Sequence, residues 1–327
     1  MTSRCTKNNP SVPFLAIGQL RKIVSFYGRF LPSFSAIGFH ARRLRWPPFA
    51  PDFSGQTWLV TGASGGIGRA AALEAARRGA RVLAVARSAG KLQALAHEAP
   101  ASVEPLVADL ALVREVRALV SGLAARGERI HVLLNNVGVM LDDYTLTAEG
   151  REASFATNLL NHYLLTEELI ARELLAPGGV VIGMSSGGMY NVPLMVEALR
   201  MPAHAYNGVL AYGLHKRAQV VLTDWWRNRH RARGLSFYVM HPGWADTEGV
   251  RTSLPRFRRL LRPVLRDEAQ AADTALWLAA QRPGQTQDDL VWFDRKARPA
   301  HAFARTRKSA GTPAQLVALL EEELQRD

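Results

Sequence analysis

The sequence has little cysteine, little lysine and no long apolar run. Cys5 is the only cysteine among 327 residues, so no internal disulfide can form and nothing calls for an oxidising compartment. The nine histidines are scattered without zinc-ligand spacing, which argues against a structural metal site. No stretch reaches the length of about 18 apolar residues that a membrane-spanning helix needs. We therefore expect a cytoplasmic protein, and a peripheral association with a membrane stays open.

Positive charge is in excess and is unevenly distributed. The 41 Lys and Arg residues outnumber the 28 Asp and Glu residues by 13, and only six of the 41 are lysines. Residues 1–52 contain eight basic residues and one acid, Asp52, for a net +7, which leaves 13 − 7 = +6 for residues 53–327. A nucleic-acid-binding protein usually concentrates its charge on a recognisable module. No such module is visible, so nucleic acid is not an expected partner.

The N-terminal 52 residues form a basic arm that is rich in aromatic side chains. Val12–Leu20 is mostly apolar, and Ile23–Ala41 mixes phenylalanines with sparse charge. Basic residues interleaved with bulky apolar ones are typical of a segment that lies on an anionic membrane. An arm that packs across its own domain would have the same composition. The sequence leaves both hypotheses open, with peripheral membrane contact assigned to residues 12–46.

From Gln56 onward, short apolar runs alternate with helical stretches. The predicted strands are Thr57–Val60, Arg81–Ala86, Val103–Val107, His131–Leu134, Val180–Met184 and Leu235–Met240. The predicted helices are Arg69–Arg78, Lys91–Glu98, Leu112–Arg126, Arg151–Leu175 and Leu210–Arg233. Continuous apolar strands separated by helices indicate a parallel sheet that is buried on both faces. The predicted fold is α/β: one doubly wound, Rossmann-like sheet flanked by helices over 53–327, with residues 1–52 as an N-terminal extension.

A glycine-rich turn follows the first predicted strand and opens a helix. It reads Thr61-Gly62-Ala63-Ser64-Gly65-Gly66-Ile67-Gly68. Gly62, Gly66 and Gly68 let the backbone turn tightly and approach a pyrophosphate at the positive end of the helix. Glycine clusters are common in turns, but this strand–turn–helix context is what the dinucleotide-binding motif requires.

The residue after the second strand bears on the choice of dinucleotide. An acid there would accept hydrogen bonds from the ribose 2′-hydroxyl, but this strand ends at Ala86 and Arg87 follows. A guanidinium suits a 2′-phosphate, so NADP(H) is favoured and NAD(H) remains possible. In so arginine-rich a chain, Arg87 could also be an ordinary surface arginine.

Five motifs in order identify the family that the chain resembles. They are Thr61–Gly68, Asn135-Asn136-Val137-Gly138, Ser185-Ser186, Tyr212-Gly213-Leu214-His215-Lys216 and Pro242-Gly243. Together they resemble the classical short-chain dehydrogenases/reductases over essentially all of residues 55–300. Three further segments resemble the branch of dehydrogenase/reductase SDR family member 12: Ser185–Tyr190, Met240–Thr247 and Asp294–Lys296.

The spacing of Tyr212 and Lys216 has a physical reason. Residues four apart lie on one face of a helix, so Lys216 can place a positive charge near the Tyr212 hydroxyl. A free phenol has a pKa of roughly 10, and a nearby ammonium favours the phenolate. We expect the Lys216 ammonium, helped by the charge of the bound nicotinamide, to lower the pKa of Tyr212 for proton exchange with substrate.

The resemblance implies roles for further residues. Ser186 would orient the substrate oxygen, with Ser185 as the competing assignment, and Asn158 would hold a water in the proton relay. Lys216 would also hold the nicotinamide ribose. The implied cofactor contacts are Thr61, Gly62, Ser64, Gly66, Ile67, Gly68, Arg87, Asp109, Leu110, Asn135, Gly138, Tyr212, Lys216, Pro242, Gly243 and Thr247.

Two segments bear on the substrate. Gly187–Val209 is a fairly apolar loop that either lines a pocket for a hydrophobic carbonyl compound or packs on the core. The arginine-rich Arg251–Arg266 resembles the family's variable lid, and a solvated charged face is the alternative.

The sequence as a whole predicts an NADP(H)-dependent oxidoreductase that interconverts a carbonyl and an alcohol on a small molecule. A non-catalytic dinucleotide-dependent binding or scaffold protein at a membrane is the alternative. A lyase or epimerase is disfavoured by the glycine spacing and the short C-terminal part. A homo-oligomer remains possible.

Overall fold

A single eight-stranded sheet organises the protein. The computed structural model describes residues 28, 30–99, 101–285 and 287–326. The strands are β1 (Thr57–Thr61), β2 (Arg81–Ala86), β3 (Val103–Val107), β4 (Ile130–Asn135), β5 (Leu175–Met184), β6 (Ser236–Met240), β7 (Leu290–Phe293) and β8 (Lys296–Pro299). Their order is β3-β2-β1-β4-β5-β6-β7-β8, and all neighbours are parallel except β7 and β8. The strands β2 and β3 are added on one side of β1, and β4 is then added on the other side. This reversal of the strand order places a crevice at the carboxyl ends of β1 and β4.

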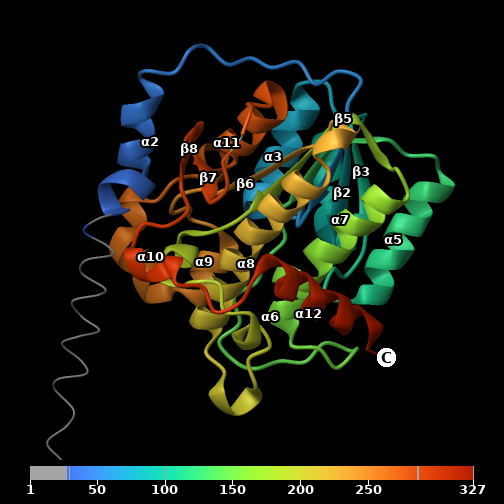
Figure 1. Cartoon of the computed structure of the whole chain (residues 1–327). Coiled ribbons are helices and arrows are strands. Elements are labelled where there is room, and N and C mark those ends of the chain that lie inside the picture. The colour runs from blue at the N-terminus through green and yellow to red at the C-terminus, as the bar shows by residue number, and fades with distance from the viewer. Residues whose placement is uncertain (1–27, 29, 100, 286, 327) are drawn as a thin grey trace, which may run out of the picture.

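Helices cover both faces of the sheet (Figure 1). On one face lie α3 (Gly66–Arg77), α4 (Ala89–Glu98) and α11 (Glu268–Gln281). On the other lie α5 (Val113–Ala125), α6 (Ala153–Phe155), α7 (Asn161–Ala171), α8 (Gly208–Arg229) and α12 (Pro313–Gln325). Successive residues of β1 contribute to opposite cores: Leu59 packs with the second group, and Trp58 and Val60 pack with the first. The predicted doubly wound, Rossmann-like fold is confirmed.

Two details of the chain differ from the sequence prediction. The expected helix over Arg151–Leu175 is broken into α6, a π-helical turn over Ala156–Leu160, and α7. It ends at Ala171, because β5 begins at Leu175, which pairs with Ile130. Pro177-Gly178-Gly179 lie inside β5, at an irregularity in its register with β4. The short strands β7 and β8 were not predicted, and β8 is the antiparallel edge of an otherwise parallel sheet.

The described part of the N-terminal arm packs on the sheet domain. It includes α2 (Ala36–Arg43), which Figure 1 shows at the β8 end of the sheet. Phe30, Phe34 and Phe39 are buried. Phe30 and Phe34 belong to a third hydrophobic cluster with residues of β7, α8 and the segment after β6. Of the two hypotheses, packing therefore holds from residue 30 onward, and Val12–Leu20 lies outside the described residues.

The remaining helices follow β6. They are α9 (Glu248–Ser253), which overlaps the start of the predicted basic lid Arg251–Arg266, and α10 (Pro255–Leu261), which lies within it. Among the described residues, no helix has the length and apolar character needed to cross a membrane.

Candidate active site

The glycine-rich turn lies between β1 and the start of α3. Gly62 and Gly66 have positive φ angles of 65° and 57°. A Cβ on Gly68 would lie 2.4 Å from the Gly62 carbonyl oxygen, so only glycine allows this approach of helix to strand. No side chain caps the N-terminus of α3. A tight glycine turn with an uncapped helix N-terminus is suited to bind a pyrophosphate. The residues of this turn therefore fit a dinucleotide.

Thr61 and Asn136 hold this turn against the end of β4. The buried Thr61 hydroxyl donates to the Leu134 carbonyl at 3.2 Å and accepts the Asn136 and Val137 N–H groups at 2.9 and 3.0 Å. Asn136 Nδ2 donates to the Thr61 carbonyl at 2.9 Å. Thr61 thus supports the turn from inside. Asn136, for which the sequence predicted no role, ties β4 to the glycine turn.

Tyr212 and Lys216 lie on one face of α8, next to the end of β5. Lys216 Nζ is 5.5 Å from the centre of the Tyr212 ring and donates to the Met184 carbonyl at 2.7 Å. The Lys216 side chain is buried, whereas Tyr212 is half-buried. The helical spacing read from the sequence therefore brings the two groups together.

Burial dominates the ionisation of both groups. It raises the pKa of Tyr212 above its ordinary value, and a hydrogen bond with Ser186 acts in the opposite direction. Burial also lowers the pKa of Lys216 to about 7. Desolvation disfavours the charged form of each group in the protein without a dinucleotide. That Lys216 and a bound nicotinamide together lower the pKa of Tyr212 stays a prediction.

Asn158 lies in the π-helical turn and faces Lys216 across Gly138. The Asn158 Oδ1 atom accepts the Val139 N–H at 2.8 Å, and Nδ2 donates to the Val139 carbonyl at 2.7 Å. A Cβ on Gly138 would lie 3.2 Å from Asn158 Oδ1 and 3.3 Å from Lys216 Nζ. The structure thus brings Asn158, Lys216 and the end of β4 to one point, and π turns are frequent at such functional points.

Gln219 and His162 support Asn158 from behind, and neither residue was assigned a role from the sequence. Gln219 Nε2 donates to the Asn158 carbonyl at 2.6 Å and lies 3.1 Å from His162 Nδ1. His162 Nε2 lies 2.8 Å from the Val137 carbonyl, and burial lowers the pKa of His162 to about 3. The imidazole is therefore neutral, with its proton on Nε2. The spacing of Gln219 three residues after Lys216 was the available clue.

The two serines after β5 have different partners. The Ser185 hydroxyl is buried and donates to the Lys216 carbonyl at 2.9 Å. Ser186 is half-buried and is the serine that is hydrogen-bonded to Tyr212. The geometry favours Ser186 over Ser185 as the group next to a substrate oxygen.

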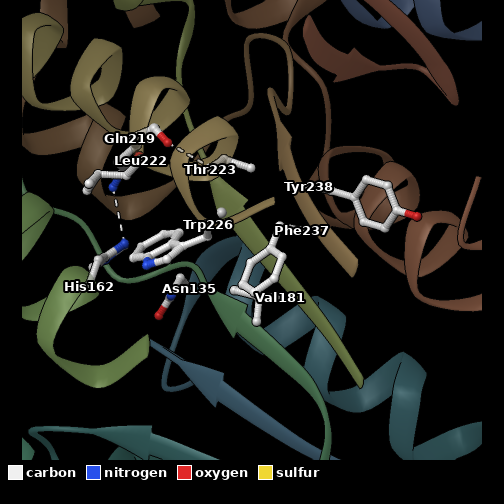
Figure 2. Close-up of a pocket in the computed structure, with 10 residues that line it drawn as sticks. Asn135, His162, Val181, Gln219, Leu222, Thr223, Trp226, Phe237 and Tyr238 are labelled. Atoms are coloured by element: carbon white, nitrogen blue, oxygen red, sulfur yellow. Dashed lines mark hydrogen bonds between the residues drawn. The ribbon is translucent and has the colours of Figure 1, made fainter. Parts of the chain in front are cut away.

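The side chain of Asn135 lies in the interior of the protein, so a cofactor contact at Asn135 would come from its backbone, and that contact stays a prediction. Asn135 Nδ2 donates to Thr166 Oγ1 at 3.0 Å. Figure 2 shows Asn135 with His162, Gln219 and Trp226 around an internal cavity of about 10 Å³. Such a volume suits about one water molecule and no substrate.

The other expected cofactor residues flank the crevice. Asp109 Oδ1 accepts the Ala111 N–H at 3.0 Å and so shapes the turn after β3. The Leu110 carbonyl accepts Asn161 Nδ2 at 2.7 Å, which gives Asn161, unassigned by sequence, a structural role. Arg87 is exposed at the end of β2, and no described carboxylate forms an ion pair with it. Ser64 and Ile67 are half-buried in the glycine turn.

The segment after β6 reaches the same crevice. Gly243 has a φ of 81°, and the Pro242 carbonyl accepts Arg266 Nη1 at 3.2 Å. The Cβ and Cγ2 atoms of Thr247 lie 3.7 Å from the position of a Cβ on Gly66. Thr247 thus lies against the glycine turn and caps α9 through its hydroxyl.

For both segments assigned to the substrate, the structure shows contacts that fit the structural alternative. In the loop after Ser186, Met189, Tyr190 and Leu194 are buried, so packing on the core accounts for most of its apolar character. In the basic segment, Arg251 and Arg258 pair with Asp246. No group of three or more metal-ligating side chains occurs in the described part of the chain.

The fold, the glycine turn and the Ser186–Tyr212–Lys216 group together define a short-chain dehydrogenase. The family model for short chain dehydrogenases matches residues 56–256, and the chain belongs to this family of oxidoreductases. Over 290 residues it is 38% identical to dehydrogenase/reductase SDR family member 12 from Bos taurus, covering 85% of this chain and 90% of the relative. It is also 33% identical to retinol dehydrogenase 12 from Bos taurus, covering 78% and 83%. A crystal structure of an uncharacterised protein from Mycobacterium paratuberculosis superposes with a TM-score of 0.67 at 29% identity, covering 85% and 96%.

Proposed function

We propose that the protein is an NADP(H)-dependent oxidoreductase that interconverts a carbonyl and an alcohol on a hydrophobic small molecule. The observation that carries the proposal is the convergence of Asn158, Ser186, Tyr212 and Lys216 on the carboxyl end of the sheet, beside the glycine turn. When bound, the dinucleotide supplies or accepts the hydride. The protein's residues manage the proton and the orientation of the substrate.

Each residue has a part that follows from its surroundings. Tyr212 exchanges the proton with the substrate oxygen, because its hydroxyl is held by Ser186, and these two are the half-buried members of the group, whereas Asn158 and Lys216 are buried. Ser186 orients that oxygen. Lys216, when protonated, stabilises negative charge that develops on Tyr212 and holds the ribose hydroxyls. Asn158 fixes the loop at Val139, next to Lys216.

The dinucleotide is proposed to be bound by the remaining residues of the crevice. The glycine turn, from Gly62 to Gly68, would hold the pyrophosphate, and Thr247 would close on it from α9. Asp109, Leu110 and Gly138 would line the adenosine and nicotinamide sides, and Pro242 and Gly243 would cover the nicotinamide. A protein from Beutenbergia cavernae that is 27% identical, provisionally described as a gluconate 5-dehydrogenase, holds NADP in its crystal structure.

A hydrophobic substrate is supported by a relative whose name states its activity, a retinol dehydrogenase. The test is a panel of apolar aldehydes, ketones and their alcohols, retinal and retinol included, assayed with NADPH or NADH for reduction and with NADP⁺ or NAD⁺ for oxidation. We expect turnover of at least one pair by the wild-type protein. A protein that only binds dinucleotide, as a scaffold would, will show binding and no turnover throughout the panel.

Arg87 is proposed as the selector for the 2′-phosphate. It is exposed at the end of β2 and no described carboxylate neutralises it, so it can pair with a phosphate. Replacing Arg87 by Asp should lower the preference for NADPH over NADH by at least about tenfold, since a charge pair becomes a repulsion. Dissociation constants of both nucleotides measure this. An unchanged ratio means that another residue makes the selection.

Peripheral membrane contact and a homo-oligomer remain parts of the proposal. The buried phenylalanines of the arm are not available to a membrane, but Ile37 and Leu44 are 62% and 89% exposed. Arg43 and Arg45 are exposed beside Leu44. This combination of apolar and cationic side chains would suit an anionic surface.

A further inference from the structure

The N-terminal arm contacts the two segments that border the catalytic group. The Phe34 ring centre is 4.2 Å from that of His241, which directly precedes Pro242. The Phe34 carbonyl accepts the Trp244 N–H at 2.9 Å. A Cβ on Gly187, the residue after Ser186, would lie 3.2 Å from Phe34 Cε2. One residue of the arm thus borders both the loop after Ser186 and the turn at Pro242.

Arg266 fastens the arm to this turn with a complete set of hydrogen bonds. Its guanidinium is 1% exposed, and each of its five N–H groups has an acceptor. Two go to Asp294, at 2.6 and 2.9 Å. The others go to the carbonyls of Phe34 at 3.0 Å, Pro242 at 3.2 Å and Ser33 at 3.1 Å. A single buried cation therefore joins the arm, the Pro242 turn and the β7–β8 turn.

The backbone of Arg266 extends the same junction. Its N–H donates to the Trp244 carbonyl at 2.8 Å, and its carbonyl accepts the Asp246 N–H at 2.9 Å. The next residue, Thr247, lies against the glycine turn at Gly66. A continuous path of contacts thus runs from the arm through Arg266 to the phosphate end of the crevice.

Gly243 shows how closely these parts fit. A Cβ at this position would lie 2.4 Å from Arg266 Nε and 2.7 Å from the Phe34 carbonyl oxygen. Its φ of 81° is also one that residues with side chains avoid. The space that a side chain at Gly243 would need is filled by Arg266 and the arm.

We propose that Ser33 and Phe34 of the arm, with Arg266 and Asp294, form a positioning unit that sets the segment Pro242–Thr247 for dinucleotide binding. The arm is then a working part of the cofactor site rather than an attachment to it. Without these contacts, nucleotide binding would have to order the segment after β6, and the lost conformational entropy would weaken the affinity. The buried junction orders the segment before nucleotide binds. The proposal rests on the proposed function where it concerns catalysis. The effect of the unit on the order of Pro242–Thr247 can be measured without turnover.

The test is a double variant, Arg266→Met with Asp294→Leu, which removes both fully buried charges together. Arg42, which also pairs with Asp294, loses that partner, but its side chain is 26% exposed and can turn to water. Hydrogen exchange of the nucleotide-free protein is followed by mass spectrometry, and NADPH affinity by fluorescence. We expect exchange in 241–247 to speed up by at least about tenfold while β1 to β4 stay protected. The dissociation constant of NADPH should rise about fivefold or more, because binding must then order the segment.

The matched control is Arg295→Met with Asp273→Leu. This pair also holds the arm, since Arg295 lies 4.2 Å from the Trp46 ring centre and 4.5 Å from that of Phe49. Within the described residues, Arg295 has no hydrogen bond or ion pair with the segment 242–247. The control should leave both the exchange of 241–247 and the NADPH affinity unchanged.

A second variant covers the case in which the Arg266 double variant does not fold. Phe34→Leu keeps an apolar side chain in the cluster but removes the ring contacts with His241 and Gly187, and it should speed exchange in 241–247 in the same direction. Unchanged exchange in 241–247 in a folded variant would overturn the proposal, and so would equal effects in the control pair. Accelerated exchange in a protein that reduces no carbonyl would refute the proposed function and leave the positioning unit intact.

Discussion

At the scale of single residues, Lys216 is the group whose charge state governs the site in the mechanism that we propose. It is buried, its Nζ donates to the Met184 carbonyl, and its pKa is lowered to about 7. A lysine with this pKa is protonated below about pH 7 and neutral above it. Its positive charge therefore stabilises a developing phenolate on Tyr212 only on the acidic side of that value.

The pH dependence of carbonyl reduction follows from this sign. Tyr212 stays protonated over the accessible range because burial raises its pKa, so the proton donor is always present. We expect kcat/KM for reduction to be constant below about pH 6.5 and to fall above about pH 7.5, as Lys216 loses its charge. Initial rates across this range measure the profile. In the variant Lys216→Arg, whose charge does not titrate there, residual activity should lack this inflection, whereas an inflection that persists assigns it to another group.

Residues of the site differ in how far the sequence could reveal them. The proximity of Tyr212 and Lys216 was predictable because residues four apart on a helix lie next to each other on one face. Their ionisation was not, since the pKa depends on burial, which the local pattern does not report. Asn135 was assigned to the cofactor from its motif, but its side chain turns to Thr166 in the interior. Motifs locate the backbone more reliably than the direction of a side chain.

At the scale of elements, the π-helical turn Ala156–Leu160 is the feature that shapes the site. The turn gives the Asn158 carbonyl a partner outside its own helix, Gln219 of α8. A regular helix over the same residues would bond its carbonyls internally. The turn and the Gln219 amide are therefore parts of one arrangement that sets Asn158 beside Lys216.

Replacing Gln219 by Leu tests this arrangement. The substitution removes the donor to the Asn158 carbonyl and to His162 Nδ1, and leaving these acceptors buried should cost about 1–3 kcal/mol of unfolding free energy. If Gln219 positions Asn158, kcat falls by about tenfold with little change in the KM of the substrate. Gln219→Glu keeps the shape but not the donor, and it should behave like the Leu variant. A loss of stability with unchanged kcat would show that Gln219 is only structural.

The elements themselves were largely predictable, and the exceptions have physical causes. The six strands from β1 to β6 were expected because buried parallel strands are continuous apolar runs. The strands β7 and β8 have only four residues each, and β8 carries Lys296 and Arg298, so their pattern was too short to read. The break between α6 and α7 was hidden because a π turn keeps the apolar side chains of a helix, with Leu159 and Leu160 both buried.

At the scale of the whole molecule, the basic residues in and around the N-terminal arm divide into two groups, one with internal partners and one on the surface. Some of the basic residues are used internally: Arg266 is buried at the arm junction, and Arg42 donates to Asp294 at 2.6 Å. Arg43 and Arg45 remain on the surface next to the exposed Leu44. Net charge alone could not separate these roles.

The exposed part of the arm predicts salt-sensitive binding to anionic vesicles. Wild-type protein should sediment with vesicles of phosphatidylserine and phosphatidylcholine at low salt and less so at high salt, since the attraction is screened. The triple variant Arg43→Glu, Leu44→Ser, Arg45→Glu should lose this binding and keep its NADPH affinity. Arg69→Glu, a charge change outside the arm, serves as the control. Equal sedimentation of all three proteins argues against membrane contact through the arm.

The central claim is that Tyr212 exchanges the proton for a hydride transfer that depends on a dinucleotide bound at the glycine turn. The most direct measurement is a single-turnover experiment in which NADPH oxidation is followed for wild-type protein and for Tyr212→Phe, with a carbonyl substrate that the panel identifies. We predict that the variant still binds NADPH while its oxidation slows by about a thousandfold or more. An equal rate of NADPH oxidation in the variant would contradict the account.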